Sequence, residues 1–400
     1  MSTPSSAAPE ARPEPGAPPS GGAVPLAVPE IGGNEGAYVQ ECLDTGWVSS
    51  AGAYVTRLEG VLADRTGAAH GVATVNGTAA LHTALMLAGV GQGDEVLLST
   101  LTFAAPAFAV RYVGAVPVCV DAEPDYWQMD VGLVADFLAN GCERREGGVF
   151  NRETGRRVAA VIPVHILGHP VEIGRLVEVV RPYGLPVIED ASEALGAEVD
   201  GAPVGASGDA ACFSFNGNKI VTAGGGGMLV TDRADWAERA RYLTTQAKDD
   251  PVEYVHHEVG YNYRLTNVQA AIAVAQMERL DEFVAAKRRI ADRYAAAFAD
   301  VPGITPAPEA PWARSTFWLY TILLDGESRS LLRALHAARI QTRPLWRAMH
   351  TLRPFADAPV VGGAVAEDLV ARSLSLPCSV GLTEADQDRV IGAILDHVSA

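Results

Sequence analysis

The sequence predicts an α/β protein with a large, mostly parallel β-sheet domain and a smaller C-terminal α/β domain. Two observations lead to this prediction. Between about residues 71 and 240, short apolar runs rich in β-branched residues alternate with amphipathic stretches, as expected for buried parallel strands joined by helices. A long helical pattern follows, and after it a shorter α/β pattern runs to residue 400.

The elements of the large domain follow in a regular order from residue 71. Strands are expected at 71–75, 94–99, 116–121, 158–164, 185–190, 212–215 and 227–232, and helices at 76–89, 103–114 and 171–184, with another starting at 236. In open α/β sheets ligands bind beyond the carboxyl ends of the strands. The loops after the strands are therefore the places to search for chemistry.

The second half of the chain predicts a linking helix and a smaller domain. Residues 267–300 are rich in Ala, Leu, Glu and Arg, and they are long enough for a helix broken once; strand-like 317–324 and helical 331–340 and 384–399 follow. The first 22 residues are rich in Pro, Ala and Ser, which is typical of a disordered tail. We therefore expect a tail at 1–22, a large domain at 23–284 and a small domain at 285–400.

Composition excludes several classes of function. The formal charge of −17 argues against nucleic-acid binding. No run approaches the about 18 apolar residues of a membrane span, and the N-terminus lacks the basic start and apolar core of a secretory signal. Five cysteines without a CxxC and nine histidines without ligand spacing predict no structural metal. We expect a reduced, cytoplasmic protein.

Three strand ends carry candidate chemistry. Residues 76–79 (NGTA) enter a helix, whose free N–H groups can cradle a phosphate, although they also fit an ordinary helix cap. Asp190 ends a buried strand, where a carboxylate is costly without a cationic partner, although it too can cap the next segment. Ser214 and Lys219 follow a third strand. A lysine in a largely apolar setting has a depressed pKa that suits Schiff-base chemistry, although Lys219 could also reach solvent.

The three features are more specific together than any one alone. Pyridoxal 5′-phosphate needs its phosphate held, its pyridine nitrogen protonated beside an acid, and its aldehyde joined to a lysine. An aromatic side chain stacked on the ring is also expected, and Phe103 follows the strand at 94–99. The sequence therefore predicts an enzyme that uses this cofactor.

Long ordered motifs also resemble a known family. The sequence is similar to the sugar aminotransferases of the DegT/DnrJ/EryC1/StrS family over nearly the whole chain from about residue 24. The resemblance lies in NGTAALHTALMLAGVGQGDEV, LTFAAPAFAVRYVGAVPVCVD, PVHILGHP, VIEDASEALGA, FSFNGNKIVTAGGGGMLVTD and GYNYRLTNVQAAIAVAQME. It implies the type I, aspartate-aminotransferase-like fold. PLAVPEIGGNEGAYVQECLDTGWVSS and TRPLWRAMH resemble in particular the LegC-like 4-aminotransferases of the legionaminic acid and bacillosamine routes.

The resemblance implies a role for each matching residue. Lys219 would join the cofactor as an imine and then carry the proton between substrate and cofactor, and Asp190 would pair with the pyridine nitrogen. Phe103 would stack on the ring. The phosphate would be held by Thr78, Ala79 and Ser214, together with Asn262 of the neighbouring subunit, which implies a homodimer with shared sites.

Other positions have less defined roles. Many family members carry His or Gln where this chain has Glu193, so this carboxyl would be protonated or turned towards the sugar. Four residues lie in segments that resemble sugar-nucleotide contact regions, and packing or surface roles fit them equally: Trp47, Arg343, Trp346 and His350. Tyr320 is expected in the core.

The function implied is transfer of the amino group of L-glutamate to a nucleotide-linked 4-keto-6-deoxyhexose, UDP-linked and derived from GlcNAc. A 3-keto sugar, a keto-cyclitol or an aminobenzoate-type acceptor would use the same catalytic residues. A dehydratase of the family would carry histidine in place of Lys219, and a non-catalytic regulator on this fold would have lost Lys219.

Overall fold

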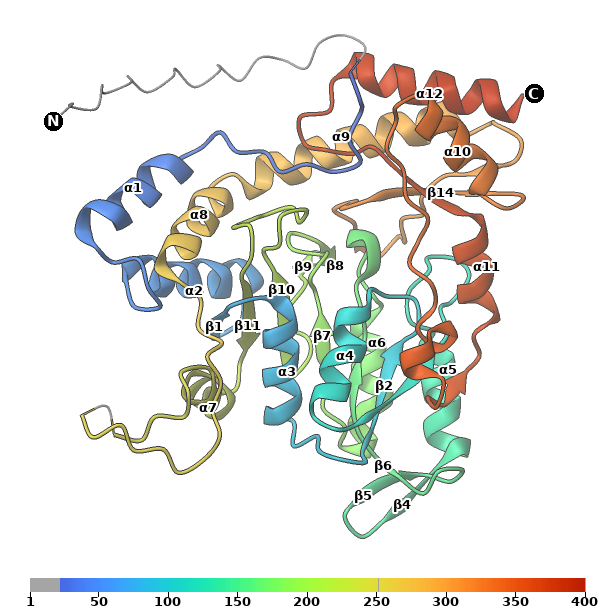
Figure 1. The fold of residues 1–400 in the computed structure, drawn as a ribbon. Coiled ribbons are helices and arrows are strands. Elements are labelled where there is room, and N and C mark those ends of the chain that lie inside the picture. Colours follow the sequence, from blue (N-terminus) through green and yellow to red (C-terminus); the bar gives the residue numbers. More distant parts are fainter. Residues whose placement is uncertain (1–21, 251, 400) are drawn as a thin grey trace, which may run out of the picture.

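The main β-sheet forms the centre of the molecule (Figure 1). The computed structural model describes residues 22–250 and 252–399, so residues 1–21 of the predicted tail lie outside the described residues. Four strands lie side by side in the order β1 (His70–Thr74), β11 (Gly227–Thr231), β10 (Ala210–Ser214) and β7 (Ile188–Asp190). The sheet continues through β6 (Arg157–Ile162), β2 (Glu95–Ser99), β3 (Val116–Val120) and β15 (Val360–Val361).

The strands of this sheet are mostly parallel. Single bridges from Val161 to Val187 and from Val164 to Asp190 join β6 to β7 in parallel. The pairs β7–β10, β6–β2, β2–β3 and β3–β15 are also parallel, whereas β11 runs antiparallel to both of its neighbours. The predicted fold class is confirmed.

Helices cover both faces of the sheet, because successive strand residues point to opposite faces. Leu98 packs in one core with α3 (Gly77–Leu87) and α4 (Ala104–Tyr112). Leu97 packs in a second core with α5 (Val131–Asp136) and α6 (Ile173–Val180). The remaining helices of this part are α1 (Glu35–Thr45), α2 (Ala53–Thr66) and α7 (Ala234–Thr244).

The predicted long helix is broken once, as expected. Two residues separate helix α8 (Asn267–Met277) from α9 (Leu280–Phe298). Beyond it, β12 (Ile304–Thr305), β14 (Tyr320–Leu324) and β16 (Ser373–Leu376) form an antiparallel sheet. The helices of this part are α10 (Arg329–Ala337), α11 (Ala364–Arg372) and α12 (Glu384–Val398). Tyr320 is buried in the core, as expected.

Short elements complete the chain. They are strands β4 (Cys142–Arg145), β5 (Gly148–Asn151), β8 (Glu198–Val199), β9 (Ala202–Pro203) and β13 (Ala313–Arg314), a π-helix at Phe137–Gly141, and 3-10 turns at Ile166–Gly168, Arg181–Tyr183, Met349–Thr351 and Arg353–Phe355.

Several contacts cross the predicted boundary at 284/285. Helix α9 spans it, β15 joins the main sheet beside β3, and Val24 pairs with Ile340. The two parts therefore share a backbone hydrogen-bond network, and the domain limits remain a prediction.

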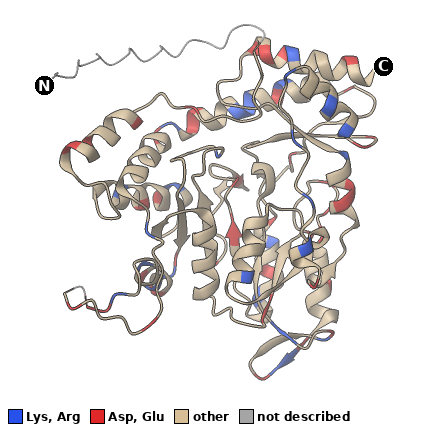
Figure 2. Ribbon diagram, in the orientation of Figure 1, with Lys and Arg blue, Asp and Glu red and all other residues tan. Residues whose placement is uncertain are grey.

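The charged side chains lie mainly on the helices and loops, and the strands of the main sheet carry few (Figure 2). Glu189 and Asp190, at the end of β7, are an exception and are both buried. All five cysteines are buried free thiols. No helix among residues 22–250 and 252–399 is long and apolar enough to cross a membrane.

Candidate active site

The predicted site residues meet in a cavity of about 380 Å³ at the carboxyl ends of β7 and β10. We call it the front cavity. Its floor is the N-terminal end of α3, and the C-terminal part of the chain contributes Trp318 and Trp346 to its wall. Of the residues predicted from sequence, it brings together Thr78, Phe103, Asp190, Glu193, Ser214, Lys219 and Trp346.

Lys219 lies in the turn after β10. Its backbone N–H donates to the carbonyl of Asn216, and its Nζ lies 3.4 Å from Oε1 of Glu193. The same Nζ lies 4.0 Å from the centroid of the Trp318 ring. The expectation of a largely apolar setting is therefore wrong, because a buried carboxyl group and an aromatic face both lie against the amine.

The four glycines at 224–227 follow this turn and bring it against α3. Gly224 and Gly226 have positive φ angles of 71° and 101°, which side chains rarely adopt. A Cβ on Gly227 would lie 2.5 Å from the carbonyl carbon of Asn76. The run therefore serves two needs: two residues make the turn, and Gly227 lets β11 approach the start of α3.

The N-terminal end of α3 opens into the front cavity. Asn76 caps the helix, and its side chain accepts the N–H of Ala79 at 2.8 Å. A Cβ on Gly77 would lie 2.9 Å from the Cβ of Ser214. The amides of Gly77 and Thr78 precede the first helical hydrogen bonds and carry the positive end of the helix dipole. The cap occupies the Ala79 amide, so an incoming phosphate would meet Thr78 first.

Asp190 is buried at the end of β7. Burial raises the pKa of its carboxyl, and this is partly opposed by hydrogen bonds from Ser192 and by the charge of Lys219. The cationic partner that the sequence argument required is thus Lys219, which acts through charge across the cavity.

Glu189, the preceding residue, faces away from the cavity and is satisfied by hydrogen bonds. It lies 2.9 Å from Nε2 of the fully buried His165, and it accepts the N–H groups of Ser207 and Gly208. Nδ1 of His165 accepts the N–H of Val171 at 2.9 Å, so Nε2 carries the proton and donates to Glu189. This pair holds the strand that presents Asp190.

Glu193 lies at the back of the front cavity. Its Oε2 accepts the N–H of Leu167 at 2.8 Å, and its Oε1 faces Lys219. Burial raises the pKa of this carboxyl, although the charge of Lys219 and the Leu167 N–H oppose the shift. The protonated form predicted from sequence is thus favoured by burial.

Two residues at the cavity wall are available to contact a ligand. Oγ1 of Thr102 is buried without a hydrogen-bond partner among the described residues. Phe103 is 56% exposed and contacts the edge of Trp346. A flat anionic ring compound would cover Phe103 and offer Thr102 an acceptor, so the residues of the cavity fit pyridoxal 5′-phosphate.

Five predicted residues lie outside the lining of the front cavity. One is the buried Ala79, whose N–H is bonded to Asn76. Trp47 lines a separate cavity with Asn267, and Arg343 is exposed and pairs with Ser375. His350 has both ring nitrogens engaged, by Thr100 at 2.7 Å and by Glu367 at 3.0 Å, which favours its packing role. Asn262 is exposed and bridges to Thr245, a position compatible with contact to a neighbouring subunit.

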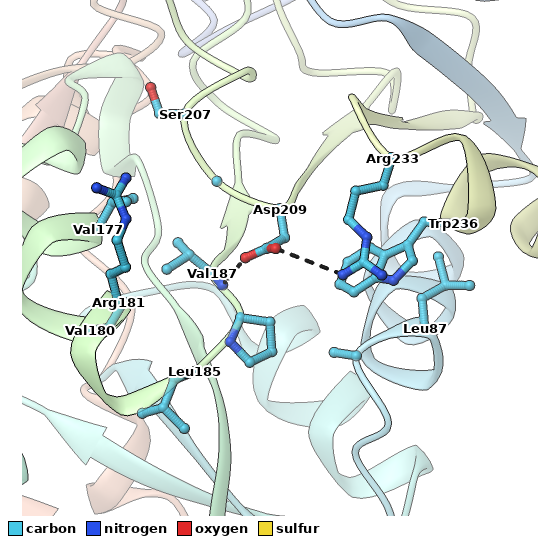
Figure 3. Close-up of a pocket in the computed structure, with 14 residues that line it drawn as sticks. Leu87, Val177, Val180, Arg181, Leu185, Val187, Ser207, Asp209, Arg233 and Trp236 are labelled. Atoms are coloured by element: carbon cyan, nitrogen blue, oxygen red, sulfur yellow. Dashed lines mark hydrogen bonds and ion pairs between the residues drawn. The ribbon is translucent and has the colours of Figure 1, made fainter.

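A second cavity, of about 520 Å³, lies at the opposite ends of the same elements (Figure 3). We call it the rear cavity. Its lining includes Leu87 at the end of α3, Val187 before β7 and Asp209 before β10. Asp209 accepts the N–H of Val187 and lies 4.0 Å from Arg233. The guanidinium of Arg233 also pairs with Asp235 and covers the ring of Trp236.

Comparison with known proteins places this geometry in a family. The model described as the DegT/DnrJ/EryC1/StrS aminotransferase family matches residues 29–395. The chain belongs to this family. Its aminotransferases depend on pyridoxal 5′-phosphate, so this DegT-family member is a sugar aminotransferase that uses this cofactor.

Individual relatives cover nearly the whole chain. A GDP-perosamine synthase of Caulobacter vibrioides is 40% identical, over 94% of this chain and 98% of its own length. A GDP-perosamine synthase of Escherichia coli O157:H7 is 36% identical, over 88% and 93%. The structure of DesI with its TDP-sugar product has a TM-score of 0.83 at 30% identity, covering 94% and 92%. None of these three is named for the legionaminic acid or bacillosamine routes, and that finer resemblance remains a prediction.

Sequence reasoning missed three residues of this DegT-family site. Thr102 adjoins Phe103 and carried no separate signal. His165 lies within the quoted motif PVHILGHP, but its buried partner Glu189 became visible only in three dimensions. Trp318 was quoted only as part of a strand, and nothing local to it points to Lys219.

Proposed function

We propose that the protein transfers the amino group of L-glutamate to a nucleotide-linked 4-keto-6-deoxyhexose, giving a 4-amino-4,6-dideoxy sugar nucleotide. One observation carries this proposal. The amine of Lys219, the carboxyl of Asp190 and the N-terminal end of α3 open on a single cavity. These are the three groups needed to hold the aldehyde, ring nitrogen and phosphate of pyridoxal 5′-phosphate.

The cofactor supplies, when bound, an aldehyde that takes up amino groups and a protonated ring that withdraws electrons from the neighbouring bond. Asp190 would pair with the ring nitrogen, and its buried position protects this contact from water. Thr78 and Ser214 would hold the phosphate at the start of α3, and Phe103 would cover the ring. Asn262 of the partner subunit would complete the phosphate site in a homodimer.

Lys219 would move the protons. Its free amine takes the proton from Cα of glutamate in the first half-reaction, and in the second it delivers a proton to the sugar carbon that receives nitrogen. Glu193 lies 3.4 Å from this amine and can hydrogen-bond to it between the two steps. The same pair of residues therefore serves both half-reactions.

The sugar nucleotide would enter from the side of Trp346 and Phe103. Lys219 is the one basic side chain among the described residues that line the front cavity. The diphosphate must therefore meet cations elsewhere, and Arg343 is a candidate together with residues of the partner subunit, whereas Trp47 is a candidate for an uncharged contact. The names of the relatives favour GDP as the nucleotide over the UDP expected from sequence, with TDP as a further candidate.

The test is turnover by the full-length protein with L-glutamate and UDP-, dTDP- and GDP-linked 4-keto-6-deoxyhexoses in parallel. Product mass and 2-oxoglutarate release would be measured. We expect amination of one nucleotide series well above the others. Turnover of a 3-keto sugar or a keto-cyclitol, with none of the 4-keto sugars, would overturn the proposed acceptor.

A further inference from the structure

Trp318 covers the amine of Lys219 although the two residues come from different parts of the chain. Trp318 lies two residues before the start of β14 and is 2% exposed. The Nζ of Lys219 lies 4.0 Å from the centroid of its ring. A cation within about 6 Å of an indole face is attracted to it, and tryptophan is the strongest of the aromatic partners.

The Trp318 indole is hydrogen-bonded to the backbone of the turn that carries Lys219. Its Nε1 donates at 2.7 Å to the carbonyl of Asn218, the residue immediately before Lys219. The ring also stacks on Trp346, with centroids 6.1 Å apart and planes within 8°. The ring and the lysine backbone are therefore tied directly to each other.

The backbone of Trp318 is held from the other side. Its carbonyl accepts Nζ of the buried Lys287 at 2.8 Å and lies 3.4 Å from the thiol of Cys378. Its N–H lies so close to Gly168 that a Cβ there would approach to 2.7 Å. Contacts from α9, from the segment after β16 and from residue 168 thus hold the backbone of Trp318 in place.

The Lys219 amine therefore lies between a carboxyl group and an aromatic ring. Glu193 lies 3.4 Å away on one side, and the Trp318 ring lies on the other. Asp190 adds negative charge from the end of β7. Asn216 and Asn218, on the turn of Lys219 itself, carry no charge.

We propose that Trp318 is a positioning residue for Lys219, whose indole face holds the free amine in its charged form opposite Glu193. The inference rests on the proposed role of Lys219 as the cofactor-binding amine. It makes the C-terminal part of the chain responsible for keeping this amine aimed into the front cavity whenever it is not bonded to the cofactor.

The test uses cofactor-free, full-length protein mixed with pyridoxal 5′-phosphate across a pH series. The rate at which the visible absorbance of the bound cofactor appears reports the fraction of uncharged amine. Trp318→Leu removes the ring face, and its rate–pH curve should move about one pH unit lower, a roughly tenfold gain of uncharged amine at a given pH. Trp318→Phe keeps a ring face and should move less. Trp236→Leu removes an indole that lines the rear cavity, and it should not move the curve.

The outcomes separate the possibilities. A Trp318→Leu curve that coincides with that of the wild-type protein would overturn the inference. So would an equal shift in Trp318→Phe and Trp318→Leu, since the Nε1 bond to Asn218 would then be responsible and not the ring face. If Trp318→Leu fails to fold, as judged by circular dichroism, Trp318→Met replaces it. The measurement needs neither glutamate nor a keto sugar, so failure of the proposed amination would leave this result readable.

Discussion

The front and rear cavities lie at opposite ends of the same three elements, α3, β7 and β10. They differ less in size than in whether their polar groups already have hydrogen-bond or ion-pair partners. The rear cavity is the larger, at about 520 Å³ against about 380 Å³. In it, Asp209 is engaged by the Val187 N–H and by Arg233, and Arg233 is engaged by Asp235 and Trp236. Asp209 and Arg233, two of its charged groups, therefore already have partners.

The front cavity keeps its polar groups available. The positive end of α3 points into it, Thr102 Oγ1 lacks a partner among the described residues, and burial raises the pKa of Asp190 and of Glu193. Helix dipoles and parallel strands both have direction, so the two ends of one α/β unit are not equivalent. The candidate active site is therefore identified by polar groups without partners and not by the larger cavity volume.

Replacement of Lys219 should have the largest effect. Lys219→Ala removes the amine that would bind the cofactor and carry the proton, and we expect turnover to fall by at least about 10³-fold. Single-turnover kinetics and the visible absorbance of the bound cofactor would measure this. Arg233→Ala, in the rear cavity, is the control and should stay within about twofold. Comparable losses in both variants would break the distinction between the cavities.

Replacement of Asp190 should come next. Asp190→Asn keeps the shape but removes the acid that would pair with the pyridine nitrogen, and we expect a fall in kcat of about 10²–10³-fold. Asp209→Asn makes the same change at the other end of the parallel strands and keeps an oxygen for the Val187 N–H. Steady-state kinetics of the two variants should therefore separate clearly, and similar values would argue against the assignment of Asp190.

A smaller effect is expected from Gly227→Ala. The added Cβ would collide with the Asn76 carbonyl and push β11 away from the start of α3, so the protein should lose about 1–3 kcal/mol of stability. Cofactor affinity should weaken by about tenfold for the same reason. Gly174→Ala in α6, where a Cβ meets nothing within 4 Å, is the control and should be neutral or stabilising. Urea unfolding and cofactor titration measure both effects.

The smallest effect concerns the pH dependence of stability. Because burial raises the pKa of Glu193, the folded protein holds a proton that the unfolded chain releases above its usual pKa of about 4.3. The free energy of unfolding should therefore fall as the pH rises from that value through the raised pKa. Glu193→Gln removes this proton, so its slope should be shallower in urea unfolding of the cofactor-free protein. Equal slopes would show that Glu193 ionises normally.

Much of the front cavity followed from the sequence, because carboxyl ends of parallel strands meet at one edge of a sheet. Asp190 and Lys219 follow neighbouring strands, and residues 76–79 begin the helix after a third. The local sequence pattern was therefore enough to predict that these three groups lie close together. The sequence did not indicate which residues of segment 342–350 face the cavity. Trp346 lines the cavity, whereas His350 hydrogen-bonds to Thr100 and Glu367. The direction of each side chain depends on what packs beside it.

The sequence by itself determined the fold class, the cofactor chemistry and the placement of Lys219 and Asp190 at one edge of the sheet, since periodicity and strand-end residues are local properties. Only the tertiary structure decided what surrounds the lysine. Trp318 and Glu193 reach its amine from distant parts of the chain, and they replace the apolar setting that the neighbouring residues suggested with an aromatic face and a carboxyl. Charge and burial act through space, so the environment of an ionisable group is set by contacts that no local pattern records.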